Sequence, residues 1–229
     1  MLENINKQLL INFLLLIVII TFFELTDVDI FIQNFFYDFE TKSWLLDKNE
    51  AITKLIFYDG IKKILIVFAL ILLSSLIFFR NKEIIKKNKK ALFLVLLSII
   101  FVPLMISSLK AITNTPCPCN IEHFNGKYPN IKLLDDYPKD FVQKSKAKCW
   151  PAGHASGGFA LMSLFFLFKS KTNRQIALTG ALLIGWSMGI YKMLIGDHFL
   201  SHTIITMILA WMIILSIEKL INIKQKAIK

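Results

Sequence analysis

Three histidines and one lysine stand at the ends of long apolar segments, where burying a charge in a bilayer would be costly. They are Lys110, His154, His198 and His202. Ionisable residues in such positions are often functional. A lysine can hold phosphate oxygens, and an imidazole can act as nucleophile or proton donor near neutral pH. Together these residue types are suited to phosphoryl transfer.

Each of these residues also has a simpler explanation. A lysine at the end of a membrane helix usually extends its ammonium group to the interface, and a single histidine more often contacts a headgroup. Gly157 and Gly158, just after His154, could serve only close helix packing. We favour the functional interpretation because all of these simpler explanations would have to hold at once.

The turn that leads to His154 is rich in small residues. Residues 151–158 read PAGHASGG and precede an apolar segment. Free backbone N–H groups at a helix N-terminus bind phosphate, and glycine lets the backbone approach a ligand closely. The turn is therefore a second feature that suits a phosphate group.

Long apolar segments must position these residues. The chain is 55% hydrophobic and its mean hydropathy is +0.57. A membrane helix needs roughly 20 apolar residues. The candidate segments lie at about 8–25, 61–79, 91–109, 155–168, 176–195 and 199–217. This pattern predicts an all-α polytopic membrane helical bundle of about six transmembrane helices. We expect one domain over residues 1–229, with its core at about 61–217.

The charge of the connecting segments sets the expected orientation. Residues 80–90 and 169–175 and the tail after Glu218 are basic. The positive-inside rule places these segments, and with them both termini, in the cytoplasm. The segments at 26–60 and 110–154 then face outward. Charged groups far apart in the sequence thereby meet at one depth on the outer membrane face.

The outward segments carry two further features. The aromatic stretch DIFIQNFFYDF (29–39) is expected to form a short interfacial helix, with a plain loop as the alternative. The segment 110–154 is an outward loop that carries part of the site. The net charge of +11 fits this topology and anionic lipid headgroups better than nucleic acid, for which the sequence has no motif.

The spacing of these motifs resembles the type-2 phosphatidic acid phosphatase superfamily, which shares a helical core with vanadium haloperoxidases. The superfamily pattern is Lys-x6-Arg-Pro, then Pro-Ser-Gly-His, then Ser-Arg-x5-His-x3-Asp. The corresponding segments here are Lys110-x6-Cys117-Pro118, Pro151-Ala152-Gly153-His154 and Tyr191-Lys192-x5-His198-x3-His202. The resemblance covers about residues 61–217.

The resemblance implies a role for each matched residue. His198 would be the nucleophile that forms a phosphohistidine, and His154 would protonate the leaving oxygen. Lys110 and Lys192 would hold phosphate oxygens, and Gly153 would offer its backbone N–H. No metal and no other cofactor is expected.

Four of the departures from the superfamily pattern bear on its chemistry. Cys117 stands for an arginine, which removes a bidentate phosphate clamp. Ala152 stands for a serine. Lys192 stands for an arginine and keeps its positive charge, but it lacks the two parallel N–H donors of the guanidinium group. His202 stands for the aspartate that would orient the nucleophile. His198 and His202 would share a helix face, so His202 could take over this orienting role.

Cys117, Cys119 and Cys149 all fall in the outward loop. In an oxidising compartment an odd count allows one disulfide and one remaining thiol, while three free thiols are the alternative. A bridge from Cys149 to Cys117 or Cys119 would hold the Lys110 end of the loop near His154. Cys117 is slightly favoured as the partner.

As a whole, the variant motifs resemble Gram-negative membrane lipid phosphatases that act on lipid A or undecaprenyl diphosphate. The resemblance implies an enzyme of the bacterial inner membrane with its site facing the periplasm. Lipid A phosphate is the favoured substrate, followed by undecaprenyl diphosphate and by phosphatidylglycerophosphate or phosphatidic acid. Phosphate transfer between lipids and a non-enzymatic phospholipid-binding or transport role are the alternatives. The expected partners are a phospholipid or glycolipid substrate and the bilayer; the oligomeric state stays open.

Overall fold

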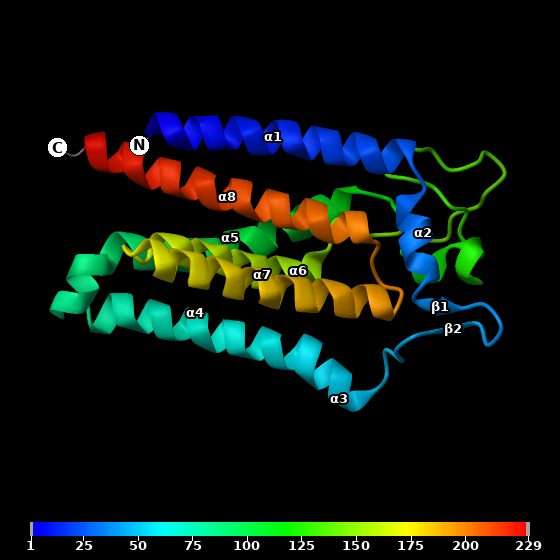
Figure 1. Ribbon diagram of the computed structural model, residues 1–229, viewed down its shortest axis with the longest axis horizontal. Helices are drawn as coiled ribbons and strands as arrows, with labels where there is room; N and C mark the ends of the chain where they lie inside the picture. The colour runs from blue at the N-terminus through cyan, green and yellow to red at the C-terminus, as the bar shows by residue number, and fades with distance from the viewer. Residues whose placement is uncertain (1, 228–229) are drawn as a thin grey trace.

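Long apolar helices run side by side in the computed structural model, which describes residues 2–227 (Figure 1). They are α1 (Leu2–Leu25), α4 (Ile61–Phe78), α5 (Glu83–Ile112), α7 (Lys171–Leu194) and α8 (Leu200–Ala227). Over the described residues, five helical spans are long and apolar enough to cross a membrane. The all-α membrane bundle expected from the sequence is thus confirmed, and the chain is a multi-pass membrane protein.

The remaining predicted span is shorter and lies inside the bundle. The segment expected at 155–168 forms α6 (Gly153–Ala160) and the 3-10 helix η4 (Leu161–Phe166). At 1.5 Å per residue it is short of a hydrocarbon layer of about 30 Å. It packs against α5, α7 and α8 and buries Ala155 and Phe159. Because other helices surround it, the segment does not have to span the lipid hydrocarbon layer by its own length.

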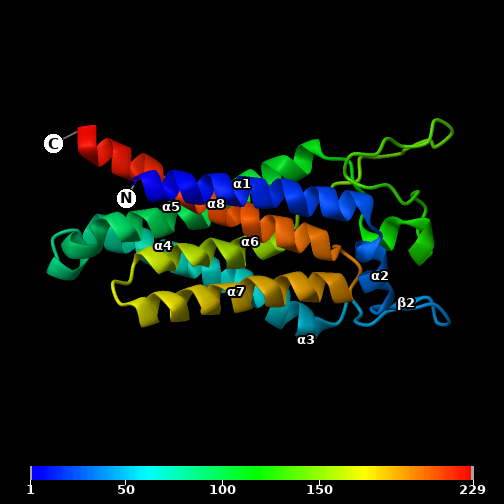
Figure 2. The same cartoon turned by 45° about the horizontal axis from the view of Figure 1, so that its top comes forward.

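The two ends of the bundle differ in charge and in structure. α1 begins and α8 ends at the same end, as expected, and the two helices remain side by side in the turned view of Figure 2. The basic segment 80–90, expected as a loop, is largely helical, since α5 begins at Glu83. Lysine and glutamate favour helix, so the basic residues extend the helix beyond its apolar part.

Side-chain burial separates the outer helices from the inner ones. α1 and α4 leave most of their apolar side chains exposed, as expected for helices that face lipid, whereas α5, α7 and α8 bury more of theirs. The core between α5, α6, α7 and α8 includes Leu94, Val102 and Phe159. A Cβ on Gly158 would lie 2.6 Å from the Cα of Gly185, so these glycines let α6 and α7 approach closely.

Short elements cover the end of the bundle opposite the termini. They are α2 (Val28–Asn34), β1 (Tyr37–Asp38), β2 (Ser43–Trp44), α3 (Ala51–Lys54), the π-helical turn η1 (Leu55–Gly60), and the 3-10 turns η2 (Pro118–Asn120) and η3 (Glu122–Phe124). The strands form an antiparallel hairpin in which Tyr37 faces Trp44. These two rings pack with Phe124 into a small aromatic core.

The interfacial helix expected at 29–39 is only partly present. α2 spans Val28–Asn34, and the hairpin replaces the remainder. Phe31 and Phe35 are exposed, which suits the membrane interface, but Gln33 is fully buried. The helix is therefore not simply laid on a lipid surface, because its polar side also contacts the rest of the protein.

Candidate active site

The turn between α7 and α8 carries His198, and several elements hold its backbone. Gly196 has φ +75°, a conformation that favours glycine, and a Cβ there would lie 2.3 Å from the Trp44 ring. The Gly196 carbonyl accepts a hydrogen bond from the Cys119 N–H at 2.9 Å. Just before the turn, the Met193 carbonyl accepts one from Gln33 Nε2 at 2.7 Å. The candidate nucleophile, His198, therefore lies on a turn whose backbone conformation is constrained.

The start of α8 is also held from outside. The first N–H groups of a helix have no partner within the helix. Asp29, on α2, accepts a hydrogen bond from the Ser201 N–H at 2.9 Å. A carboxylate at this position also interacts favourably with the helix dipole. α2 therefore anchors the first turn of α8, which contains His202.

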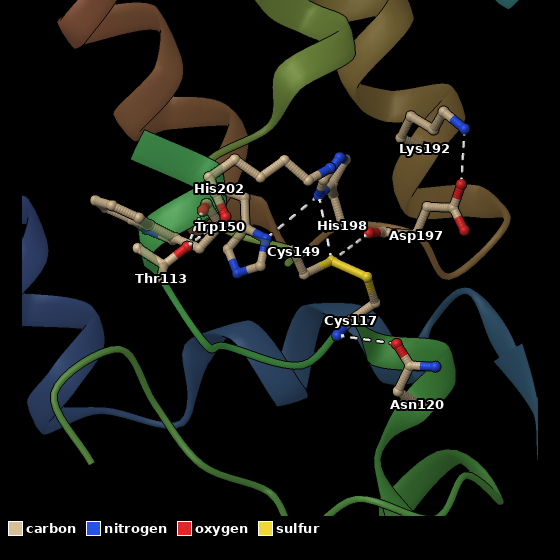
Figure 3. Close-up of a disulfide and its surroundings, with 10 residues drawn as sticks. Thr113, Cys117, Asn120, Cys149, Trp150, Lys192, Asp197, His198 and His202 are labelled. Atoms are coloured by element: carbon tan, nitrogen blue, oxygen red, sulfur yellow. Dashed lines mark hydrogen bonds and ion pairs between the residues drawn. A yellow bond between two sulfur atoms is a disulfide. The ribbon is translucent and has the colours of Figure 1, made fainter. Parts of the chain in front are cut away.

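His198 and His202 face one another through their Nδ1 atoms. These atoms are 3.4 Å apart, and both side chains are buried (Figure 3). The His202 ring also has a hydrogen bond with the backbone of Cys149. The approach through Nδ1 leaves Nε2 of His198 directed away from His202.

A disulfide joins Cys117 to Cys149, the pairing favoured from the sequence, while Cys119 keeps its thiol. Cys149 Sγ lies 3.6 Å from His198 Nδ1 and 2.8 Å from the Asp197 carbonyl oxygen. A disulfide sulfur carries no hydrogen, so these are packing contacts and not donated bonds. The disulfide thus forms one wall around His198, as Figure 3 shows.

His154 and Lys110 come to the same end of the bundle from different helices. His154 lies in the first turn of α6, and its ring centroid is 6.3 Å from that of His198. Lys110 lies in the last turn of α5, where its Cδ would be 3.8 Å from a Cβ on Gly153. Thr113 Oγ1 donates to the Trp150 carbonyl at 2.6 Å and so ties the end of α5 to the turn before α6.

Lys192 forms an ion pair with Asp197, with Nζ and Oδ2 2.7 Å apart. Both residues line an open pocket of about 350 Å³, together with Lys48 and Lys54 from the segment before α4. Sequence reasoning missed these two lysines, because nothing in a polar loop indicates which side chains return to the site. Asp197 lies in the turn that follows α7, and its carboxylate reaches back to Lys192 in the last turn of that helix.

A comparison with family models decides which group of proteins has this arrangement. The PAP2 superfamily matches residues 91–225, more than half of the chain. The protein belongs to the PAP2 superfamily. No curated protein and no solved structure gives a significant match. Membership implies phosphatase activity on lipid-like substrates.

The departures from the PAP2 superfamily pattern at Cys117, Ala152, Lys192 and His202 have distinct surroundings. Cys117 forms part of the disulfide beside His198 and cannot bind phosphate as an arginine would. His202 contacts His198, the residue that the aspartate of the pattern would orient. Ala152 is fully buried, and its N–H donates to Thr206 Oγ1 of α8 at 2.8 Å. Lys192 retains a cation, which Asp197 neutralises.

The environment of His198 favours the neutral imidazole. Burial lowers the pKa of this residue well below its ordinary 6.5, and the charges of His202 and Lys110 lower it further. His198 precedes the first residue of α8 and lies in the turn outside the spans. A neutral ring at pH 7 has the free lone pair that a nucleophile requires.

Proposed function

We propose that this protein is an integral membrane lipid phosphatase that forms a phosphohistidine on His198. The observation that carries the proposal is the 3.4 Å approach of His198 Nδ1 to His202 Nδ1. A proton on Nδ1 of His198, donated to His202, leaves the lone pair on Nε2 of His198. The hydrogen bond between His202 and the Cys149 backbone helps to fix the orientation of the second ring.

In the proposed first step, Nε2 of His198 attacks phosphorus, and the bond from phosphorus to the lipid oxygen breaks. His154 donates a proton to that oxygen, so the lipid leaves as a neutral alcohol or as a monophosphate. Water then attacks the phosphohistidine, giving up its proton to His154, and phosphate is released from His198. Lys110, Lys192 and the Gly153 N–H stabilise the negative charge on the transferring group.

The favoured substrate is lipid A phosphate. An open pocket bordered by Lys48, Lys54 and Lys192 lies next to the turn that carries His198, and its cations support a phosphate on a sugar headgroup as the ligand. The acyl chains would stay in the bilayer, level with the ends of the spans. The basic connecting segments at the opposite end support a periplasmic site in a bacterial inner membrane.

Phosphate release from purified protein tests the proposal. Oxidised protein in detergent should release phosphate from lipid A in excess EDTA, faster than from undecaprenyl diphosphate or phosphatidylglycerophosphate. His198→Ala should abolish both turnover and an acid-labile phosphoenzyme, and His154→Ala should slow turnover by about 10²–10⁴-fold. If none of these lipids is hydrolysed, or if His198→Ala keeps the wild-type rate, the proposal is wrong.

The His202 variants test the orienting contact separately. His202→Ala should lower kcat because Nδ1 of His198 loses its partner, whereas His202→Asp should retain more activity than His202→Ala by restoring an acceptor. Equal activity of the alanine variant and the wild type would show that the 3.4 Å contact has no catalytic role. Mass spectrometry of membrane lipids from cells with and without the gene identifies the natural substrate.

A further inference from the structure

We propose that reduction of the Cys117–Cys149 disulfide creates a binding site for a thiophilic divalent cation, with Zn²⁺ as the best fit. Cys149, His198 and His202 offer donor atoms that all lie within 4.8 Å of one another. In the oxidised protein Cys149 is bonded to sulfur and offers no thiolate. The proposed site therefore exists only in the dithiol form, and it shares His198 with the phosphatase.

The spacing of the donor atoms matches zinc coordination. A tetrahedral Zn²⁺ with bonds of roughly 2.05 Å to nitrogen and 2.3 Å to sulfur separates two nitrogens by roughly 3.4 Å, and sulfur from nitrogen by roughly 3.6 Å. The Nδ1 atoms of His198 and His202 are 3.4 Å apart. Cys149 Sγ and His198 Nδ1 are 3.6 Å apart. Two of the three donor pairs thus already have the separation that a shared tetrahedral metal imposes, and the third pair, Cys149 and His202, lies within 4.8 Å.

The composition and burial of the cluster also favour zinc. Two imidazoles and a thiolate suit Zn²⁺ better than Mg²⁺ or Ca²⁺, which prefer oxygen donors. Cys149, His198 and His202 are all buried, so solvent competes weakly for the metal. The hydrogen bond from His202 to the Cys149 backbone holds one ligand ring in place. Cys149, His198 and His202 supply three protein ligands, which leaves the fourth tetrahedral position to water.

Formation of the site needs a reductant, either a dithiol or a phosphine. With a phosphine, one water molecule and the disulfide give two thiols and the phosphine oxide. The metal then binds the Cys149 thiolate and the two neutral imidazoles, and the proton of the Cys149 thiol is released. A metal on Nδ1 of His198 would move the ring proton to Nε2, and Nε2 would then lack the lone pair that attacks phosphorus. Reduction together with metal binding would therefore switch the enzyme off, and a chelator would reverse the metal-dependent part of the loss.

Cobalt titration of the full-length protein in detergent tests the site directly. Phosphine-reduced protein should take up about one Co²⁺ per chain, with a thiolate-to-cobalt charge-transfer band and the visible bands of a tetrahedral ion. Zn²⁺ should displace the cobalt. Oxidised protein should develop neither band, and Cys149→Ser should lose the charge-transfer band. Cys119→Ser is the matched control and should behave like the wild type in both redox states.

A variant that cannot close the bridge keeps the test independent of the reductant. Cys117→Ser with Cys119→Ser leaves Cys149 as a thiol and should bind cobalt through one sulfur without any phosphine. Absence of the charge-transfer band from both reduced protein and this variant would overturn the proposal. Equal cobalt spectra before and after reduction, or in reduced Cys149→Ser, would also overturn it. These spectra need no turnover, so they are informative even if the proposed phosphatase activity fails its own test.

Inhibition supplies the functional readout. Zn²⁺ should abolish phosphate release by reduced protein, EDTA should restore it to the level of the metal-free reduced protein, and oxidised protein should be insensitive. Equal inhibition of the oxidised protein would place the inhibitory metal elsewhere and would overturn the proposed switch.

Discussion

The carboxyl group of Asp29 should make the stability of the protein depend on pH. Burial raises the pKa of this residue from 3.8 to about 6, although Ser201 donates to it and Lys132 attracts its charge. The folded state therefore binds the proton more tightly than the unfolded state. Its stabilising effect is complete below about pH 4 and is lost as the pH rises through 6.

A difference of about two pKa units corresponds to about 3 kcal/mol. The Asp29 side chain is partly exposed, and solvent screening reduces this value, so we expect about 1–3 kcal/mol. Asp29→Asn removes the charge but keeps an oxygen that can accept the Ser201 N–H. The variant should therefore be more stable than the wild type at pH 7.5 and equally stable or less stable at pH 4.

Thermal unfolding in detergent between pH 4 and pH 8 measures this effect. For a protein of this size, 1 kcal/mol shifts Tm by about 2–4 °C. Asp27→Asn is the matched control, because Asp27 is 81% exposed in its ion pair with Lys132 and such pairs contribute little. If Asp29→Asn fails to raise Tm at pH 7.5, or if it changes the pH profile no more than Asp27→Asn, the reasoning is refuted.

Three further predictions concern the site and the packing beneath it. Cys149→Ser opens a bridge between residues 32 positions apart and should lower the free energy of unfolding by about 3–4 kcal/mol, measured by denaturation without reductant; an unchanged midpoint would contradict this. Asp197→Asn should remove the negative charge beside the Lys192 ammonium and lower the Ki of inorganic phosphate, and a higher Ki would instead assign Asp197 to positioning. Gly158→Ala should lower Tm more than Gly157→Ala, because its Cβ would meet helix backbone at 2.6 Å and not a leucine methyl group at 3.0 Å; the reverse order of Tm values would contradict the packing argument.

The helical bundle and the closeness of His198 to His202 could be predicted because both depend on residues that are near one another in the sequence. Apolar length indicates each span, and His198 and His202 lie four residues apart at a helix start. The pairing of Cys117 with Cys149 was favoured over Cys119 only slightly. The alternatives lie two residues apart, and nothing in their spacing determines which one faces Cys149.

The contacts between distant polar residues could not be predicted in the same way. Asp29 and Gln33 lie on an amphipathic stretch whose composition suits a membrane interface, yet both bond to the turn and helix around His198. The sequence pattern of such a stretch is the same whether its single polar side chain faces water or binds a buried carbonyl. The composition of the turn likewise does not predict the positive φ of Gly196 or the ion pair between Asp197 and Lys192.

The substitution of His202 for an aspartate is consistent with the other changes around it. A carboxylate buried beside the disulfide would need compensating hydrogen bonds or a nearby cation, because an unpaired buried charge is costly. A neutral imidazole can accept a proton from His198 on one nitrogen and donate to the Cys149 backbone from the other. It therefore satisfies two polar groups without adding charge. The same neutrality gives a cationic His198 less stabilisation than a carboxylate would, so the proposed mechanism relies on Lys110 and Lys192 for charge stabilisation.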